Sequence, residues 1–323
     1  MKSMIIVNFG GPRLLSEVES FLIALLTDRD VIRTKLPKMI HRWFFTRIAK
    51  KRALKVAEDY QLIGGKSPIF EDTEAVAKAV ASHLNINILT FHRYLTETHA
   101  SFINQVCDLE EETVVFPMFP QFSFATTGSI ARFFKNNVPK NRLEKMRWVK
   151  SYADHPAYVR LLQNNIRTYL LEQDLKDEEC ILLFSAHGIP LQFVKTGDTY
   201  EKECKRSFEA VAIAFPKIKC RLSYQSKFGR GEWLRPYTDE VCRDILEWSE
   251  GRRHVIFIPL SFTSDHIETL FEVEQLYMPV IRKAGLSAHR CPAPNRSTAW
   301  TTTIAHIAQT SPLVPTDALI YSP

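Results

Sequence analysis

Short apolar runs that alternate with longer stretches of helical periodicity restrict the fold of this chain more than any other feature. Four runs are typical of buried strands: "MIIVNFGGP" from residue 4, "TVVFPMFPQ" from 113, "CILLFSAHGIP" from 180 and "HVIFIPLSFTS" from 254. A fifth, "NINILTFHRY", begins at residue 85, and residues 73–84 and 155–173 have the apolar spacing of helices. This order predicts an α/β protein in which helices cover parallel strands.

The runs fall into two similar halves. Each half opens with an apolar strand that ends on Gly and Pro, and each closes with a strand of aromatic residues and proline that leads into a helix. The repetition favours two Rossmann-like lobes, each a parallel sheet flanked by helices, at residues 1–150 and 151–323. A last helix within "STAWTTTIAHIAQ" can pack back on the first lobe, and we expect the last dozen residues to fray. A cleft between the lobes is the predicted ligand site.

Composition and charge are those of a mildly basic globular protein. The chain has 323 residues, of which 45% are hydrophobic and 24% charged, and its net charge is +6. The densest basic cluster, at residues 46–55, follows Trp43, Phe44 and Phe45. It is either a solvated helix face or a contact for an anionic membrane surface or a nucleic acid. No recognition motif or basic stripe supports a nucleic-acid partner.

The cysteines and the amino-terminal residues predict the compartment. Six cysteines occur without a CxxC spacing, which favours free thiols in a reducing cytoplasm over a zinc ribbon or a disulfide framework. The first residues run directly into an apolar strand without the pattern of a secretion signal. No run approaches the roughly 18 apolar residues that a membrane span needs. We therefore expect a cytoplasmic protein that is at most peripheral to the inner face of a membrane.

Polar groups that can do chemistry follow two of the predicted strands. His187 ends the run from residue 180, and the run from 254 leads to His266 and to Asp265, Glu268 and Glu272, which share one helix face. A lone histidine is more often structural, and a charged stripe is more often solvated. Together, however, they suit proton transfer or loose binding of a divalent metal such as Fe(II). The sequence lacks the HExxH, GxGxxG and GxxxxGK[ST] motifs, so neither a metalloprotease nor a nucleotide site is indicated.

Aromatic and cationic residues near the strand ends indicate what such a site acts on. Each is by itself more typical of core packing, but together they are able to line a slot for a large, flat, apolar molecule. Arg29 or Arg93 can meet carboxylates of that molecule. The residues are Phe9, Tyr60, Phe91, Arg93, Tyr94, Phe122, Phe124 and Trp233.

Six sequence blocks resemble those of the ferrochelatases, the enzymes that insert Fe(II) into a porphyrin to end haem synthesis. The resemblance runs from residue 7 to about residue 308, and the blocks stand in the family's order. They are "FLIALLTDRDVI", "YQLIGGKSPI", "FPQFSFATTGS", "LLFSAHGIP", "YQSKFGRGEWLRPYT" and "FTSDHIETLFEVE". The resemblance implies the class II chelatase fold, with two Rossmann-like lobes around a porphyrin cleft, and a widened π turn in the last block.

The resemblance also implies roles for individual residues. It maps the catalytic, iron-contacting pair onto His187 and Glu268, and a path for protons or metal onto Asp265, His266 and Glu272. It implies a hydrophobic lip and a possible membrane contact within residues 21–55. The substrate-binding residues that we predict are Phe9, Arg29, Tyr60, Ser67, Arg93, Tyr94, Ser123 and Trp233.

Departures from the family pattern refine the prediction. Phe9 stands where relatives specialised for coproporphyrin carry a Tyr that can ligate iron, which favours protoporphyrin IX as the substrate. Phe124 lies in the region where some relatives hold a cluster cysteine, and no cysteine follows Cys291, so we expect a monomer without an iron–sulfur cluster. Iron is then a substrate, and no resident cofactor is predicted. The alternatives are a chelatase for coproporphyrin III or sirohydrochlorin, and a non-catalytic haem or porphyrin carrier.

Overall fold

The computed structural model describes every residue except 110, 230 and 323. Contacts within the chain divide it into two compact units, each of which is described by itself. The first contains Met1–Ser151 together with Ile304–Pro323, and the second contains Tyr152–Thr303. The long helix α13 (Thr298–Thr310) runs through the second boundary.

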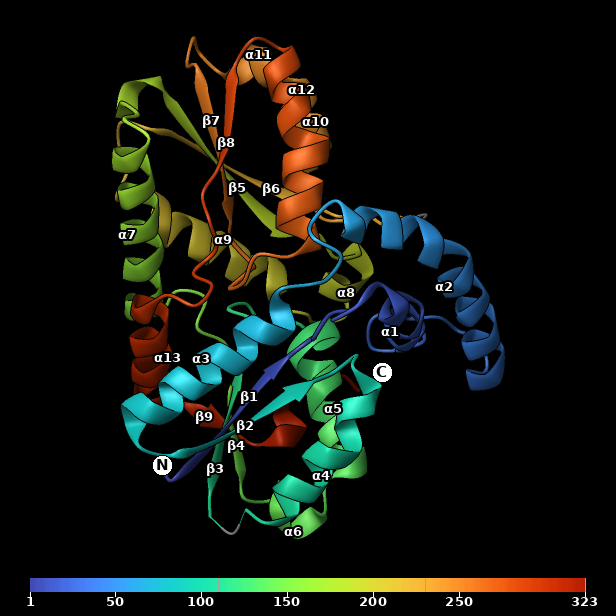
Figure 1. The fold of residues 1–323 in the computed structure, drawn as a ribbon. Helices are drawn as coiled ribbons and strands as arrows, with labels where there is room; N and C mark the ends of the chain where they lie inside the picture. The colour runs from blue at the N-terminus through green and yellow to red at the C-terminus, as the bar shows by residue number, and fades with distance from the viewer. Residues whose placement is uncertain (110, 230, 323) are drawn as a thin grey trace. The chain divides into compact units, whose positions relative to one another are not determined.

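The first unit is built on a five-stranded sheet with the order β2-β1-β3-β4-β9 (Figure 1). Four strands are parallel and the short β9 is antiparallel to β4. The strands are β1 (Ser3–Asn8), β2 (Asn87–His92), β3 (Thr113–Pro117), β4 (Met146–Val149) and β9 (Leu313–Val314). The helices are α1 (Val18–Leu26), α2 (Lys38–Gln61), α3 (Ile69–Leu84), α4 (His99–Cys107), α5 (Ser129–Asn137) and α6 (Lys140–Leu143). Short 3₁₀ turns cover Leu15–Glu17, Thr96–Thr98 and Thr316–Leu319, and a π turn covers Phe124–Gly128.

The second unit holds a four-stranded, fully parallel sheet with the order β6-β5-β7-β8. Its strands are β5 (Cys180–His187), β6 (Lys219–Gln225), β7 (His254–Pro259) and β8 (Ser287–Arg290). Its other helices are α7 (Pro156–Glu172), α8 (Leu191–Lys195), α9 (Tyr200–Ala212), α10 (Thr238–Arg243), α11 (Ile245–Trp248) and α12 (Met278–Lys283). A 3₁₀ turn covers Asp177–Glu179, and a wide π-helix, Ile267–Tyr277, leads into α12.

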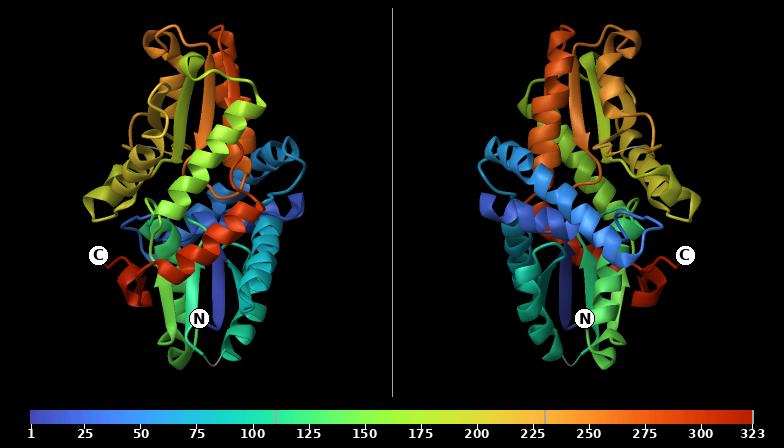
Figure 2. Two further views of the ribbon diagram at one scale, coloured as in Figure 1. Left: turned by 90° about the vertical axis from the view of Figure 1, so that its left-hand side faces the viewer. Right: turned by 90° about the vertical axis from the view of Figure 1, so that its right-hand side faces the viewer.

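Burial on both faces explains why the central strands are continuous apolar runs. Successive side chains of a strand point to opposite faces of its sheet. On β5, Ile181 and Leu183 pack in one cluster with α10, α12 and the π-helix, whereas Phe184 contacts Phe208 of α9 at 5.2 Å between ring centroids. Helices therefore cover both faces, as Figure 2 shows from two further sides, and parallel sheets need this cover. The predicted α/β fold class with two helix-flanked parallel sheets is confirmed.

Some strands carry no apolar signal and were not predicted. The segment Lys219–Gln225, "KCRLSYQ", is only partly buried over its first half, so polar side chains interrupt its apolar pattern. It nevertheless pairs with β5 along its whole length, from Ile181↔Lys219 to His187↔Gln225. This segment therefore forms a strand because it pairs with the buried strand β5, although its own sequence pattern does not predict one.

The carboxyl-terminal residues belong to the first unit, whereas the sequence analysis assigns residues 151–323 to the second lobe and expects the last dozen to fray. For residues 313–319 the expected fraying is wrong, and residue 323 lies outside the described residues. Leu319 is fully buried in the first core, and β9 pairs with β4 at Trp148↔Val314. The indole nitrogen Nε1 of Trp148 donates to Oγ1 of Thr316 at 3.0 Å. Ion pairing adds a further contact, since Lys135 lies 2.7 Å from Asp317.

The Trp148–Thr316 hydrogen bond gives a direct test of how this end is held. Thr316→Val keeps the shape of the side chain but leaves a buried indole N–H without its acceptor, so we expect a loss of about 1–3 kcal/mol in the free energy of unfolding. Chemical denaturation measures the difference. Thr302→Val, at an exposed position of α13, is the control and is expected to change stability by less than about 0.5 kcal/mol. Equal effects of the two variants would contradict the assignment.

Candidate functional site

His187 stands at the carboxyl end of β5, opposite Gln225 of β6. The next residue lets the chain turn closely: Gly188 N donates to Gln225 O at 2.8 Å, and a Cβ at position 188 would lie 2.8 Å from that same oxygen. Only glycine fits such a close backbone approach. The His187 side chain remains 37% exposed, so a group at the end of the strand is able to reach it.

The π-helix Ile267–Tyr277 brings Glu268 to His187. The distance from His187 Nδ1 to Glu268 Oε2 is 2.9 Å, and since an ionised carboxylate has no proton, Nδ1 is the donor. His266 is the residue before the helix, and its backbone N–H donates to Thr269 Oγ1 at 3.0 Å. Its Nε2 lies 3.8 Å from the same Glu268 oxygen. Two imidazoles and one carboxylate therefore meet at the first turn of the helix.

The two partners shift each other's pKa. Burial alone would lower the pKa of His187, but the charge and hydrogen bond of Glu268, with the charge of Glu272, raise it above its usual value. Burial would likewise raise the pKa of Glu268, yet the charge and hydrogen bond of His187 lower it well below the usual range. Burial lowers the pKa of His266 despite the acids beside it. Glu268 is thus the ionised member of the group, and His266 the neutral one near pH 7.

Glu272, one helical turn further, has a different environment. Its Oε2 accepts from Ser226 Oγ at 2.6 Å and from Gln225 Nε2 at 3.1 Å. Burial and the charge of Glu268 raise the pKa of Glu272 to about 7, in spite of the hydrogen bond from Ser226. The two carboxylates of one helix face therefore differ: Glu268 stays charged, while Glu272 exchanges a proton near neutral pH.

Asp265 does not join this group. Its Oδ1 lies 2.7 Å from Arg290 Nη1, and its Oδ2 accepts from Asn295 Nδ2 at 2.9 Å and from the backbone of Ala293 at 3.3 Å. Arg290 also binds Glu274 at 2.7 Å. These contacts attach the loop before the π-helix to β8, where Arg290 is the last residue. Both oxygens of Asp265 are engaged, so its predicted part in a proton or metal path stays a prediction.

In the first unit, predicted substrate residues gather at the carboxyl ends of β1 and β2. The Phe9 ring lies 5.1 Å from that of Tyr94 and 4.9 Å from that of Phe119. Arg93 and Tyr94 both bind Asp28 Oδ2, at 2.8 and 3.0 Å. Arg93 is therefore already paired with a buried carboxylate within its own unit.

The remaining predicted substrate residues lie in different settings. Arg29 is exposed and donates to Thr34 O at 3.3 Å. Tyr60 is buried on α2, and Ser67 is buried where its N–H donates to Pro12 O at 2.7 Å. Ser123 Oγ accepts from Ala125 N at 3.1 Å and so caps the π turn that follows. In the second unit, Trp233 lies beside Gly188, whose Cβ would be 3.4 Å from its ring.

Sequence reasoning did not identify Gln225, Ser226 and Arg290. All three depend on neighbours that only strand pairing brings close, since β6 and β8 carry no apolar run. One signal was present for the first two: they follow Tyr224 in the block "YQSKFGRGEWLRPYT" that resembles the family. A polar pair inside such a block was a candidate for contact with the acidic helix.

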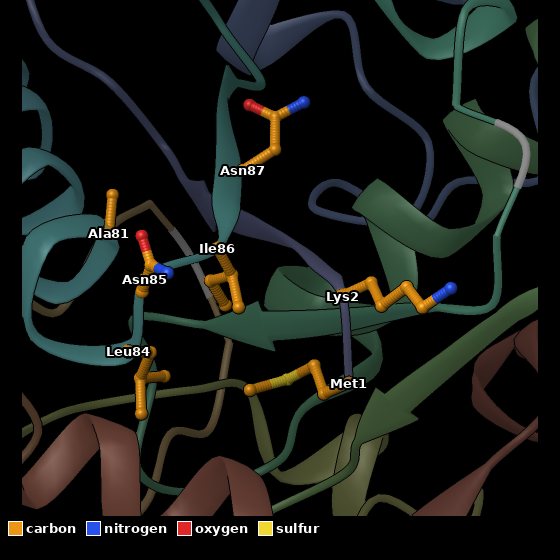
Figure 3. Close-up of a pocket in the computed structure, with 7 residues that line it drawn as sticks. All are labelled: Met1, Lys2, Ala81, Leu84, Asn85, Ile86 and Asn87. Carbon is orange, nitrogen blue, oxygen red and sulfur yellow. The ribbon is translucent and has the colours of Figure 1, made fainter.

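Other parts of the described chain offer less chemistry. A hollow of about 490 Å³ lies at the amino ends of β1 and β2 and is lined by Met1, Lys2, Ala81 and residues 84–87 (Figure 3). Its one charged side chain, Lys2, binds Glu111 at 2.8 Å. Over the residues that the structure describes, no group of three or more His, Cys, Asp or Glu side chains is arranged to hold a metal ion.

Comparisons with known proteins agree on one family. The family model described as Ferrochelatase matches residues 1–311. The ferrochelatase of Chlamydia caviae is 43% identical over 323 residues, which is 100% of both chains. The ferrochelatase of Chlamydia trachomatis serovar A is 41% identical over 312 residues, covering 97% of this chain and 96% of the relative.

A solved structure supports the fold class. It is the structure of CbiX, the terminal enzyme for biosynthesis of siroheme in denitrifying bacteria, and it aligns with a TM-score of 0.51. The alignment covers 96% of this chain and 98% of that one at 14% sequence identity, so the likeness concerns the fold alone.

The contacts of Asp265 predict that it stabilises the unit. Asp265→Asn removes the charge that faces Arg290 inside the protein, and we expect a loss of about 1–3 kcal/mol in the free energy of unfolding. Asp239→Asn is the matched control, because its partner Arg243 is exposed and 3.4 Å away, and it is expected to cost less than about 1 kcal/mol. Urea denaturation compares them. Wild-type stability of Asp265→Asn would contradict the anchoring role.

Proposed function

The chain belongs to the ferrochelatase family, and on that premise we propose that it inserts Fe(II) into protoporphyrin IX through the His187–Glu268 pair. It is accordingly a lyase that loads a metal into a porphyrin for haem synthesis. The reaction replaces two pyrrole N–H protons by iron, so the enzyme needs a proton acceptor next to the ring and a route by which the protons leave. The 2.9 Å contact between an imidazole and a carboxylate at a strand end carries this proposal.

The proposed role of His187 follows from the atom that Glu268 leaves free. With Nδ1 donating to Glu268, the lone pair of Nε2 is available to accept a pyrrole proton or to contact iron. The ionised Glu268 stabilises the imidazolium that forms, which is why the pKa of His187 is raised. A stronger base at the ring favours removal of protons from a weakly acidic pyrrole.

The proposed route for protons continues along the helix. Glu272, with its pKa near 7, is able to take up a proton and release it to solvent around neutral pH. Burial lowers the pKa of His266, whose Nε2 lies 3.8 Å from Glu268. In its neutral form this imidazole is able to bind Fe(II) as it passes. In this scheme Glu268 guides the metal or the proton and Glu272 delivers the proton to solvent.

Phe9 supports the choice of protoporphyrin IX over coproporphyrin III. Its ring packs against Tyr94 and Phe119 and offers no oxygen to iron. Coproporphyrin and sirohydrochlorin carry more carboxylates than protoporphyrin and would need more free cations, whereas Arg93 is already paired with Asp28. A non-catalytic porphyrin carrier would not need an imidazole that is hydrogen-bonded to a carboxylate. The His187–Glu268 pair therefore favours an enzyme.

The proposal includes no iron–sulfur cluster and no partner subunit. Phe124 lies in the region where some relatives have a cluster cysteine, and the sequence has no cysteine after Cys291. The six cysteines are free thiols, as a protein of the reducing cytoplasm would have. Within the described residues, no helix is both long and apolar enough to cross a bilayer.

We further propose that α2 contacts an anionic membrane surface, from which a poorly soluble porphyrin can be collected. The helix exposes Met39 at 85% and Trp43 at 61%, and with Arg42, Arg47 and Lys50 they line a hollow of about 460 Å³. The guanidinium of Arg47 lies 5.3 Å from the centre of the Trp43 ring. No acidic residue occurs between residues 31 and 57. Lys50 lies 3.9 Å from Glu19 of α1. Exposed apolar groups beside the guanidinium groups of Arg42 and Arg47 nevertheless suit an anionic lipid headgroup layer.

Vesicle binding tests this contact. The wild-type protein is expected to co-sediment with vesicles that contain phosphatidylserine and not with pure phosphatidylcholine, and to be released by high salt. Trp43→Ser together with Arg47→Glu is expected to abolish binding. Leu171→Ser, at another exposed apolar position of 74% exposure, is the control that should bind like wild type. Equal recovery with both lipids would contradict the electrostatic contact.

Replacement of His187 tests the catalytic proposal. His187→Ala removes the proton acceptor, and we expect kcat for iron insertion to fall about 100-fold or more, with unchanged circular dichroism and thermal unfolding. His289→Ala, which changes a histidine of β8 whose Nε2 lies 3.2 Å from His254, is the control and is expected to retain turnover. An anaerobic assay that follows the porphyrin spectrum measures both. Turnover by His187→Ala near the wild-type rate would refute the assignment.

A further inference from the structure

Gln225 is a buried amide with four hydrogen-bond partners close to the His187–Glu268 pair, of which the hydroxyl of Ser226 is the most distant, at 3.5 Å. It is the last residue of β6, its side chain is only 2% exposed, and it stands opposite His187 in the sheet. Its Oε1 accepts from Ser185 Oγ at 2.6 Å. Its Nε2 donates to the backbone oxygen of Glu268 at 2.7 Å and to Glu272 Oε2 at 3.1 Å. One amide thus joins β5, β6 and two turns of the acidic helix.

The chemistry of the partners fixes the orientation of this amide. A backbone carbonyl only accepts hydrogen bonds, so Nε2 of Gln225 must face Glu268, and Oε1 must face the hydroxyl of Ser185. Ser185 in turn lies 3.3 Å from Thr238 Oγ1, which lies 2.9 Å from Ser223 Oγ. The buried hydroxyl of Ser185 therefore holds the carbonyl end of the amide, while its amino end binds the helix.

We propose that Gln225 is a positioning residue for metal insertion, which holds Glu268 and Glu272 as two separate carboxylates at a fixed spacing. The inference rests on the proposed function of the His187–Glu268 pair. The amide ties the main chain at Glu268 to the side chain of Glu272, and so connects the start of the π-helix to its next turn. Loss of this tie lets both carboxylates move relative to His187, although the amide contacts neither iron nor porphyrin.

The same contact affects the proton that Glu272 exchanges. The hydrogen bonds of Ser226 and Gln225 stabilise the ionised carboxylate, against the effects of burial and the Glu268 charge. The titratable groups that interact with Glu272 are Glu268 and Tyr277 on its own helix and His187 on β5. Without the amide, ionisation of Glu272 needs a higher pH, and the acid limb of the activity profile moves with it.

Three variants test the proposal in the full-length protein. Gln225→Met keeps the length of the side chain without a donor, and we expect kcat at pH 7 to fall about 10–100-fold with a raised KM for Fe(II). The acid limb of kcat should move up by on the order of one pH unit, with an unchanged KM for porphyrin. Ser185→Ala removes the hydrogen bond to Gln225 and touches no carboxylate, so it should give a smaller shift in the same direction. Ser223→Ala, which removes a buried hydroxyl that does not touch Gln225, is the control and should leave the limb unchanged.

The outcomes separate this inference from the proposed function. If wild type turns over and both Gln225→Met and Ser185→Ala keep its acid limb and Fe(II) KM, the positioning role is wrong. A uniform loss of activity with a raised porphyrin KM would show a merely structural residue and also overturn it. If Gln225→Met does not fold, the acid limbs of Ser185→Ala and Ser223→Ala are compared instead. An equal limb in these two variants would contradict the positioning role. Absence of metal insertion by wild type would overturn the proposed function itself and, with it, this inference.

Discussion

The hydrogen bond of 2.9 Å between His187 and Glu268 is the interaction on which the rest of the site depends. It joins two elements that are far apart in sequence, the end of β5 and the first turn of the π-helix. Because the partners favour each other's charged forms, a base with a raised pKa stands at the strand end beside a carboxylate that stays ionised. An enzyme that exchanges pyrrole protons for a metal needs both properties in one place.

The surrounding contacts keep that pair in position and separate the roles of the acidic side chains. Asp265 is bound by Arg290 and Asn295 and so anchors the loop before the helix. Glu272 is held by Ser226 and Gln225 and titrates near pH 7. Asp265, Glu268 and Glu272 thus differ in their environments: the first anchors the loop, the second remains charged beside the histidine, and the third exchanges a proton near pH 7.

The sequence predicted those parts of the structure that have a local signal. β1, β5 and β7 were identified because both of their faces are buried and their residues are continuously apolar. The spacing of Asp265, Glu268 and Glu272 predicted one helix face. That is right for Glu268 and Glu272 but wrong for Asp265, which precedes the helix and binds Arg290. The π turn came from the resemblance to ferrochelatases, since spacing alone does not distinguish it from an α-helix. The pairing of His187 with Glu268 likewise came from that resemblance, with the geometry supplied by the structure.

The missed features depend on contacts that are distant in sequence. Gln225 is the last residue of β6, a strand that its polar sequence does not predict. The contacts of Gln225 are evident only from the pairing of β6 with β5. Arg93 looked available for a carboxylate, but Asp28, which is distant in sequence, pairs with it. The last dozen residues were expected to fray, but Thr316 binds Trp148 and Leu319 packs in the first core. In each case the local sequence was uninformative, because the role of the residue depends on a partner that is distant in the sequence.

The central claim, iron insertion into protoporphyrin IX, is tested most directly by an anaerobic assay of the purified protein with Fe(II). Protoporphyrin IX and coproporphyrin III are offered separately, and the porphyrin spectrum is followed as it changes to that of the metallated product. The account predicts fast metallation of protoporphyrin IX and much slower metallation of coproporphyrin III, consistent with Phe9 offering no ligand to iron. Preference for coproporphyrin III would contradict the substrate assignment, and tight binding of both porphyrins without turnover would contradict the enzymatic one.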